Sequence, residues 1–237
     1  MTLLCLDAGN TRLKWGLRAP GGWLAQGTIA HAEIDALTLP APVQRILACN
    51  VAGADVAAAI ETLAAKLAAP LAWFKSSAAA CGVSNGYDNF SQLGADRWAA
   101  LIGAHALHAG PALVVVAGTA TTIDALSAEG QFRGGLILPG LGLMRRALAR
   151  NTAGLPEACG HFAEWPTNTD DAIVSGALQA TLGAIERMAA RHCRPASVDF
   201  CVILSGGAAA DLAPHLSLPV RRIEHLVLEG LAVGRVW

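Results

Sequence analysis

Charged side chains are scarce in this chain, and no pattern collects them on one face. They make up 15% of the 237 residues, and the formal net charge is −1. No basic block and no Lys/Arg-rich stretch interleaved with aromatic residues is present, so little in the sequence would neutralise a nucleic-acid backbone. We therefore expect no nucleic-acid partner.

Long apolar runs are also missing, although hydrophobic residues make up 54% of the chain. Alanine carries much of this fraction, and no run reaches the roughly 18 uncharged apolar residues that a transmembrane helix needs. Asp7 and Arg12 fall where a signal peptide would need an apolar stretch and a cleavage site. The expectation is a well-packed globular protein that is cytoplasmic and has no membrane partner.

The six cysteines are scattered and include no CxxC pair, so neither a zinc site nor a disulfide framework is indicated. Cys5, Cys49 and Cys201 lie in apolar, strand-like runs, where cysteine behaves as a small hydrophobe. His105 and His108 are spaced i, i+3 on an expected helix, but no third ligand lies near them in the sequence. We interpret them as residues of a helix surface.

Hydrophobic periodicity predicts a mixed α/β chain. After an apolar strand, residues 12–18 alternate between polar and apolar types, which is the signal of a half-buried hairpin. Further on, helices alternate with strands. The expected strands are 3–6, 13–17, 23–28, 46–51, 71–74, 112–116, 123–126, 132–138 and 200–204, and the expected helices are 55–68, 95–109, 141–149, 170–191 and 227–236.

The opening pattern of strand, glycine turn and strand occurs twice. Aligned on the glycines, residues 7–11 (DAGNT) correspond to residues 116–120 (VAGTA), about 110 residues later. Two such copies suggest an internally duplicated protein. We therefore expect two lobes, residues 1–110 with the first turn and residues 111–237 with the second.

A glycine turn between two strands lets the backbone approach a ligand and direct N–H groups into a concavity, which suits an anion. In the first turn Asn10 and Thr11 add side-chain donors, Lys14 adds a cation, and Asp7 can hold Mg²⁺ directly or through water. The second turn, Gly118–Thr122, offers hydroxyls and amides without charge. Either turn alone is as readily an ordinary hairpin turn, whereas the pair favours a polyphosphate gripped from both sides of a cleft. Neither is a Walker A loop or a GxGxxG fingerprint.

Asp96 and Arg97 open an expected helix after Gly94 and Ala95. A lone Asp in a first helical turn is usually an N-terminal capping residue. Arg97 is a cation where the helix dipole disfavours one, so it needs another reason to lie there. A general base beside a binder of anions or hydroxyls supplies such a reason. Both interpretations of Asp96 stay open at this point.

Together these residues resemble the type III pantothenate kinases, a bacterial family of the actin-like, sugar-kinase and heat-shock ATPase superfamily. The resemblance runs along nearly the whole chain, and GADR followed some twenty residues later by GTATT is its most specific part. The matching stretches are 7–11 with Lys14, 85–87, 94–98, 118–122, 134–140, 152–156 and 205–207.

The resemblance implies a duplicated actin-like (ribonuclease H-like) two-lobed ATPase fold, with mixed sheets flanked by helices. It further implies ATP-dependent phosphorylation of the primary hydroxyl of pantothenate, the first step toward coenzyme A, by a homodimer that uses Mg²⁺ and a monovalent cation, K⁺ or NH₄⁺. Asp96 would be the proton acceptor. The other implied contacts are Asp7, Ala8, Gly9, Asn10, Thr11, Arg12, Leu13, Lys14 and Thr119 to ATP, and Tyr87, Gly94, Ala95, Asp96, Arg97 and the neighbouring subunit's Thr169 to pantothenate.

One position departs from the family's pattern. Most members carry Asp two residues before the second glycine, as the ligand of the monovalent cation, and this chain has Val116 there. Valine cannot coordinate a cation, so we expect a weakened or absent dependence on K⁺. Asp7 is then the only carboxylate left at the leading position of either turn.

Two alternatives to an active pantothenate kinase remain. One is a catalytically weak or inactive regulatory or ligand-binding homologue, of the accessory transcription factor type, and Val116 is the feature that favours it. The other is an actin-fold kinase for another small alcohol or sugar. Retention of Asp7, Lys14, Asp96 and Arg97 favours an enzyme, because a protein without catalysis has little need of a base beside a substrate hydroxyl.

Overall fold

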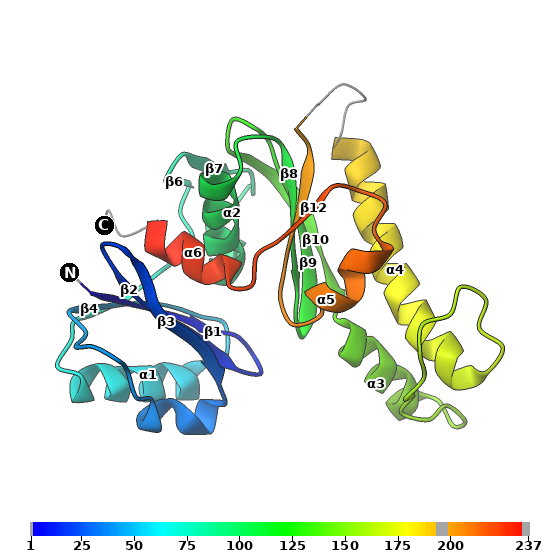
Figure 1. The fold of residues 1–237 in the computed structure, drawn as a ribbon, viewed down its shortest axis with the longest axis horizontal. Helices are drawn as coiled ribbons and strands as arrows, with labels where there is room; N and C mark the ends of the chain where they lie inside the picture. The colour runs from blue at the N-terminus through cyan, green and yellow to red at the C-terminus, as the bar shows by residue number, and fades with distance from the viewer. Residues whose placement is uncertain (1, 193–198, 234–237) are drawn as a thin grey trace. The chain divides into compact units, whose positions relative to one another are not determined.

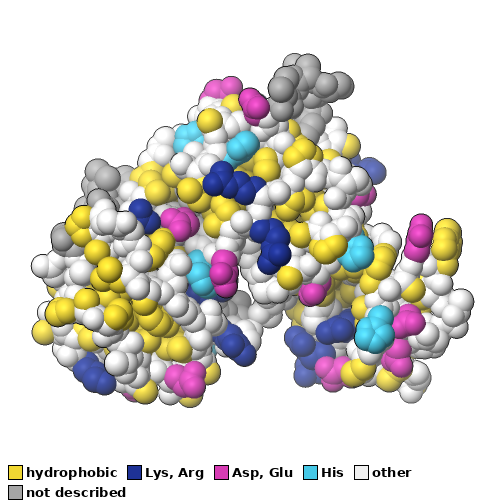
Figure 2. All heavy atoms as spheres, in the orientation of Figure 1, with side chains coloured by type: hydrophobic (Ala, Val, Ile, Leu, Met, Phe, Trp, Pro, Cys, Tyr) yellow, Lys and Arg dark blue, Asp and Glu magenta, His cyan; other side chains and the backbone are white. Residues whose placement is uncertain are grey.

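The structure, a computed structural model, describes residues 2–192 and 199–233 (Figure 1 and Figure 2). They form two compact units, and each is considered by itself. The first unit comprises residues 2–109, 129–133 and 225–233, and the second comprises residues 110–128 together with the described part of 134–224.

The first unit is built on a five-stranded sheet of order β3-β2-β1-β4-β5. The central strand β1 (Leu3–Ala8) is antiparallel to β2 (Leu13–Ala19) and parallel to β4 (Arg45–Asn50). The edge strands are β3 (Gly22–Ile29) and β5 (Leu71–Trp73). The predicted N-terminal hairpin is therefore present, with its turn at residues 9–12.

The two faces of this sheet have different partners. Leu4 and Leu6 point to one face, where they join the core beneath α1 (Ala54–Lys66) and the 3₁₀ helix η1 (His31–Ala36). Because side chains alternate along a strand, Asp7 and its cross-strand partners point to the opposite face. The helices α2 (Ala95–Leu107) and α6 (Leu226–Val233) lie on that face of the sheet (Figure 1).

Glycines allow α2 and α6 to pack backbone against backbone. A Cβ at Gly103 would lie 2.7 Å from the carbonyl oxygen of Leu226, and one at Gly230 would collide with the carbonyl oxygen of Ala99. Polar contacts also fix α6 to the sheet, since Glu229 accepts a hydrogen bond from the indole N–H of Trp23 at 2.7 Å. The C-terminal helix is therefore an integral part of the first unit.

Gly230→Ala is expected to lower the free energy of unfolding by about 1–3 kcal/mol, because the added methyl group forces α6 away from α2. Chemical denaturation measures the change. Gly183→Ala is the matched control: a Cβ at this helical glycine meets no described atom within 4 Å, so the exchange should stabilise by about 0.5–1 kcal/mol. Equal effects of the two substitutions would contradict the close packing of α2 and α6.

The rest of the first unit consists of short pieces. The strand β6 (Ala79–Ala80) pairs with β7 (Val83–Asn85), and η2 (Phe90–Gln92) precedes α2. β7 also pairs in parallel with Gln131 and Phe132, the first residues of β10. β7 and η2 lie in a stretch for which the sequence predicts neither a helix nor a strand.

The second unit repeats the architecture of the first, with strand order β12-β11-β8-β9-β10. The central strand β8 (Ala112–Ala117) is antiparallel to β9 (Ala120–Leu126) and parallel to β11 (Cys201–Ser205). The outer strands of this unit are β12 (Val220–Arg222) and β10 (Gln131–Pro139), and the first residues of β10 belong to the first unit, where they pair with β7. Its helices are α3 (Leu141–Asn151), α4 (Thr169–His192), α5 (Ala209–Leu212) and the 3₁₀ helix η3 (Ala213–His215).

The internal duplication is confirmed down to single residues. Asp7 pairs with Lys14 on the antiparallel neighbour and with Cys49 on the parallel neighbour. At the equivalent point of the second sheet, Val116 pairs with Thr122 and with Ser205. The glycine alignment thus matches positions that have the same strand neighbours.

The predicted helices and strands are present, with ends that shift by a few residues. The structure adds η1, β6, β7, η2, α5, η3 and β12, which are all six residues or shorter and carry too little periodicity to be predicted. The helix predicted to end at Val236 is described only as far as Val233. Within the described residues, every helix is too short or too polar to cross a membrane.

Candidate active site

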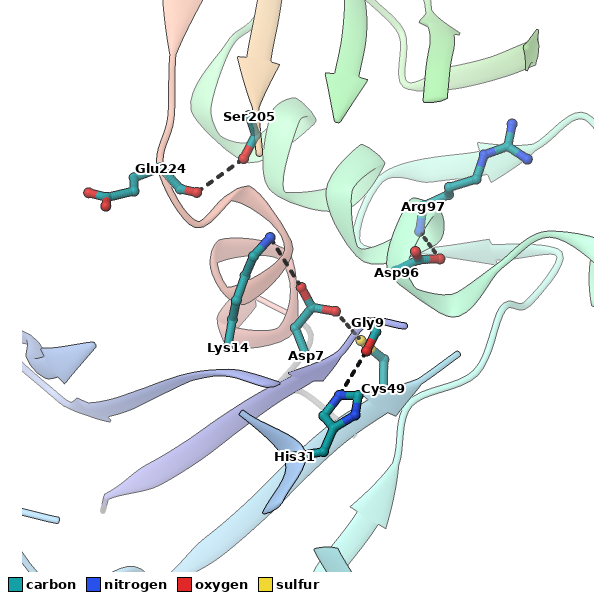
Figure 3. Close-up of polar contacts among 9 residues, drawn as sticks. All are labelled: Asp7, Gly9, Lys14, His31, Cys49, Asp96, Arg97, Ser205 and Glu224. Carbon is teal, nitrogen blue, oxygen red and sulfur yellow. Dashed lines mark hydrogen bonds and ion pairs between the residues drawn. The ribbon is translucent and has the colours of Figure 1, made fainter. Parts of the chain in front are cut away.

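A carboxylate, an ammonium group and a thiol meet on three neighbouring strands of the first unit (Figure 3). Asp7 on β1 is 5% exposed. Its Oδ2 lies 3.8 Å from Nζ of Lys14 on β2, and its Oδ1 accepts a hydrogen bond from Sγ of Cys49 on β4 at 3.5 Å. The sequence indicated Asp7 and Lys14, whereas Cys49 had been assigned to the core.

Burial raises the pKa of Asp7 to about 6. The positive charge of Lys14 acts in the opposite direction, the negative charge of Asp96 raises the pKa further, and the hydrogen bond from Cys49 lowers it. Burial also raises the pKa of Cys49 well above its ordinary value, so the thiol keeps its proton and remains a donor. Above about pH 6 the site therefore holds a buried carboxylate whose charge is only partly compensated, which favours binding of a cation.

Backbone groups rather than side chains hold the turn between β1 and β2. The carbonyl oxygen of Ala8 accepts a hydrogen bond from the amide of Val51 at 3.0 Å. The carbonyl oxygen of Gly9 lies 3.0 Å from Nε2 of His31. The tip of the turn is exposed at Asn10, Thr11 and Arg12. Of the predicted ATP contacts, Ala8 and Leu13 are fully buried in the core of the first unit.

The start of α2 carries the predicted base. Gly94 is the N-cap residue and supplies no side-chain cap, while Oδ1 of Asp96 accepts a hydrogen bond from the amide of Arg97 at 2.8 Å. Asp96 therefore satisfies one amide of the first helical turn. It is half-buried and close enough to Asp7 to raise that residue's pKa. The local geometry agrees with both interpretations of Asp96, the helix cap and the base.

An aromatic pocket accounts for the unusual position of Arg97. Its side chain is 5% exposed, and Nη1 donates a hydrogen bond to the hydroxyl of Tyr87 at 2.9 Å. The guanidinium carbon lies 5.6 Å from the centre of the Tyr87 ring and 5.9 Å from that of Phe132. Cation–π attraction thus offsets the unfavourable helix dipole. Phe132 was not predicted as part of the site, because an aromatic residue in a strand pattern indicates a core position.

The second unit holds the remaining predicted residues. Thr119 is exposed at the tip of the β8–β9 turn, and its carbonyl oxygen accepts a hydrogen bond from the amide of Gly140 at 2.9 Å. Gly206 has a φ of +97° and lies against the backbone of Ala117, where a Cβ would collide. Thr169 is exposed as the first residue of α4.

The second unit also encloses a pocket of about 400 Å³ lined by residues of α3, α4, α5 and η3. Its wall is mixed in character. Leu141, Ala177 and Leu178 contribute apolar surface, and the charged or polar side chains that line it are Arg145, His161, Asp211 and His215. Sequence patterns do not indicate this pocket, because its residues come from four separate segments.

No group of three or more His, Cys, Asp or Glu side chains that could hold a metal occurs in the described part of the chain. The protein's contribution to a magnesium site would be the single carboxylate of Asp7. This fits Mg²⁺, which commonly takes one or two carboxylates and completes its shell with water and substrate phosphates. The incomplete neutralisation of Asp7 by Lys14 agrees with such a role.

Comparison with known proteins identifies relatives along the whole chain. The family model described as type III pantothenate kinase matches residues 3–191. A type III pantothenate kinase of Aromatoleum aromaticum is 52% identical over 98% of this chain and 96% of the relative. Among solved structures, a Baf family transcriptional activator from Campylobacter jejuni has a TM-score of 0.64 at 20% identity, covering 97% of this chain and 95% of the other. A 2-dehydro-3-deoxygalactonokinase from Sinorhizobium meliloti has a TM-score of 0.60 at 16% identity, covering 99% of both chains. The two structural likenesses show the fold alone, and they confirm the predicted actin-like architecture.

Proposed function

Since this chain belongs to the type III pantothenate kinase family and so phosphorylates pantothenate with ATP, we propose that Asp96 is the general base of that reaction. Phosphoryl transfer depends on charge neutralisation and in-line alignment more than on covalent help from the protein. A carboxylate within hydrogen-bond reach of the substrate hydroxyl is enough to accept its proton. The half-buried position of Asp96, near enough to the buried Asp7 to raise its pKa, supports this role.

Pantothenate is proposed to bind around the start of α2. Arg97 is held rigidly by Tyr87 and Phe132, so its donors are preorganised for an anionic or hydroxyl-bearing substrate. Gly94 and Ala95 would contact the substrate through their backbone. Family resemblance adds the neighbouring subunit's Thr169, which in this chain is an exposed residue.

ATP is proposed to bind through the turn that carries Asp7–Lys14, with Thr119 as a further contact. Lys14 would neutralise phosphate charge, and the exposed amides and side chains of residues 10–12 would donate to phosphate oxygens. Mg²⁺ held by Asp7 and the phosphates would add Lewis-acid stabilisation of the transferred group.

A coupled assay of ADP release decides among the three candidate functions. We expect turnover with ATP and pantothenate, and little without pantothenate. Turnover with a sugar or another small alcohol but not with pantothenate would favour a different actin-fold kinase. Binding of ATP without turnover of any acceptor would favour the regulatory homologue.

We expect turnover in sodium buffer to lie within about twofold of turnover in potassium buffer. Val116 occupies the place where most relatives have the cation's carboxylate, and its strand neighbours Thr122 and Ser205 offer only neutral hydroxyls. Asp124 on β9 pairs with Val114 and not with Val116, so its carboxylate lies two residues along the strand from the position where relatives have the cation ligand. Strong activation by potassium or ammonium would contradict this prediction.

The chain is further proposed to form a homodimer in the cytoplasm. In the second unit, β10 and α3 expose large apolar side chains, with Ile137 at 65%, Leu136 at 40% and Leu148 at 39%. Helix α3 has an amphipathic sequence and yet contains no buried residue. We propose the apolar side of α3 as the interface, because a contiguous exposed apolar surface is typical of one. Sedimentation equilibrium tests the proposal, and a monomer at micromolar concentration would contradict it.

A further inference from the structure

The side chain of His31 contacts the turn between β1 and β2, which is the proposed ATP-phosphate turn (Figure 3). No sequence pattern indicates this residue. Its Nε2 lies 3.0 Å from the carbonyl oxygen of Gly9. Because a carbonyl oxygen can only accept, Nε2 must carry the proton and donate it. The imidazolium and the neutral tautomer protonated on Nε2 both do so, and the contact therefore does not depend on the charge of the ring.

The imidazole is mounted on a fixed element. His31 is the first residue of η1, and Glu33 ties down the start of that helix. Oε2 of Glu33 accepts a hydrogen bond from the amide of Ala30 at 2.8 Å, and the amide of Glu33 donates to the carbonyl of Ala30 at 3.0 Å. Ile34, three residues after His31, is 1% exposed in the core of the first unit. The backbone that carries the His31 ring is thus anchored on both sides, so the ring can hold the turn in one position.

Holding the carbonyl of Gly9 also fixes the amide that follows it. In a trans peptide the C=O of one residue and the N–H of the next point in opposite directions, and the described residues contain no cis peptide bond. With the Gly9 carbonyl directed to His31, the N–H of Asn10 points away from His31. Asn10 is exposed, and its N–H donates to no acceptor within the described residues. A directed amide donor therefore remains for a ligand.

We infer that His31 is a positioning residue of the ATP site, which holds the Gly9–Asn10 peptide so that its N–H is presented to a phosphate oxygen. Glycine at position 9 makes this restraint necessary, because a peptide next to glycine rotates easily. A rotated peptide would turn the carbonyl oxygen, and not the N–H, toward the phosphates and would repel them. The inference rests on the proposed binding of ATP at this turn.

Replacing the ring tests the inference. His31→Leu removes the donor, and we expect the KM for ATP to rise at least fivefold while the KM for pantothenate and the midpoint of thermal unfolding change little. His31→Gln offers an N–H donor of similar reach, and its KM for ATP should stay within about twofold of the wild type. His105→Leu is the matched control, because His105 is a half-buried histidine of the same unit that lies against Gly82, far along the chain from the turn.

Three outcomes would overturn the inference: an unchanged KM for ATP in His31→Leu, an equal rise in both KM values, or a loss in His31→Gln as large as in His31→Leu. Calorimetric titration with ATP in the absence of pantothenate gives a second readout, in which His31→Leu should bind at least fivefold more weakly. A wild type that binds ATP but does not phosphorylate pantothenate would refute the proposed function alone, since the binding comparison would still decide the role of His31.

Discussion

Asp96→Asn is expected to lower pantothenate turnover by a factor of about 10²–10⁴, the usual contribution of a positioned base, while ATP still binds. The substitution is informative because of the contact that Asp96 makes at the start of α2. Oδ1 of Asp96 accepts a hydrogen bond from the backbone N–H of Arg97, and the side-chain oxygen of asparagine can accept the same hydrogen bond. The exchange thus keeps the helix cap and removes only the basic, charged oxygen.

The exchange should also leave the charge of Asp7, in the proposed ATP-phosphate turn, intact. The negative charge of Asp96 raises the pKa of Asp7, so its removal lets Asp7 ionise more readily. A loss of turnover would therefore not come from protonation of Asp7. Calorimetry with ATP and steady-state kinetics with pantothenate measure the two properties separately.

The control is Asp88→Asn, an exposed carboxylate in the loop that leads to α2. It undergoes the same chemical change and should leave turnover within about twofold of the wild type. Near-normal turnover of Asp96→Asn would remove Asp96 as the base and leave it as a helix cap. A parallel loss of ATP affinity would indicate a role in nucleotide binding instead.

Asp7→Asn is expected to produce a protein that is more stable and nearly inactive. The folded protein holds this carboxylate with a pKa of about 6, above the ordinary value of 3.8, because burial disfavours the charged form. A shift of roughly 2 units corresponds to about 3 kcal/mol at most, so a gain of about 1–3 kcal/mol is expected above pH 7 when the charge is removed. Activity falls because the variant lacks the carboxylate proposed to hold Mg²⁺ at the phosphates.

The gain in stability has a defined pH dependence. A raised pKa means that the folded protein binds a proton more tightly than the unfolded chain does, so wild-type stability falls as pH rises from about 4 through about 6. The variant cannot titrate at this position. The difference between the two proteins should therefore be full above about pH 6 and disappear near pH 4.

Urea denaturation in the presence of a chelator, at pH 4.5 and at pH 8, measures this difference. Asp35→Asn serves as the control, because it makes the same chemical change at an exposed carboxylate of the same unit. A variant less stable than the wild type at pH 8 would contradict the prediction. It would mean that the ionised carboxylate of Asp7 stabilises the fold, although burial disfavours its charge.

Much of the fold could be predicted because its strongest signals are local. The alternation in residues 12–18 gave the hairpin, and the repeated glycine turn gave the duplication that the two strand orders confirm. The packing of α6 against α2 could not be predicted in the same way. It depends on Gly103 and Gly230, two glycines more than 120 residues apart that have meaning only once their helices touch.

In the candidate site, too, local signals could be predicted from the sequence and contacts across the fold could not. Asp7 and Lys14 could be indicated from the sequence because they flank a glycine turn between two strands. Arg97 could be indicated because the helix dipole disfavours a cation in a first helical turn, and it drew attention to its neighbour Asp96. Contacts made across the fold left no such mark. His31 lies outside any motif and acts through a single hydrogen bond to a backbone carbonyl, which no residue type at position 9 would reveal.

The matching strand orders of the two units bear on how such a chain diverges. Two copies of one supersecondary unit, joined in a single gene product, are free to change independently, whereas identical subunits must change together. At equivalent positions of the two sheets, one copy has the charged row Lys14, Asp7 and Cys49, and the other has the neutral row Thr122, Val116 and Ser205. The two sheets thus share one arrangement of strands, while the side chains at equivalent positions differ in charge.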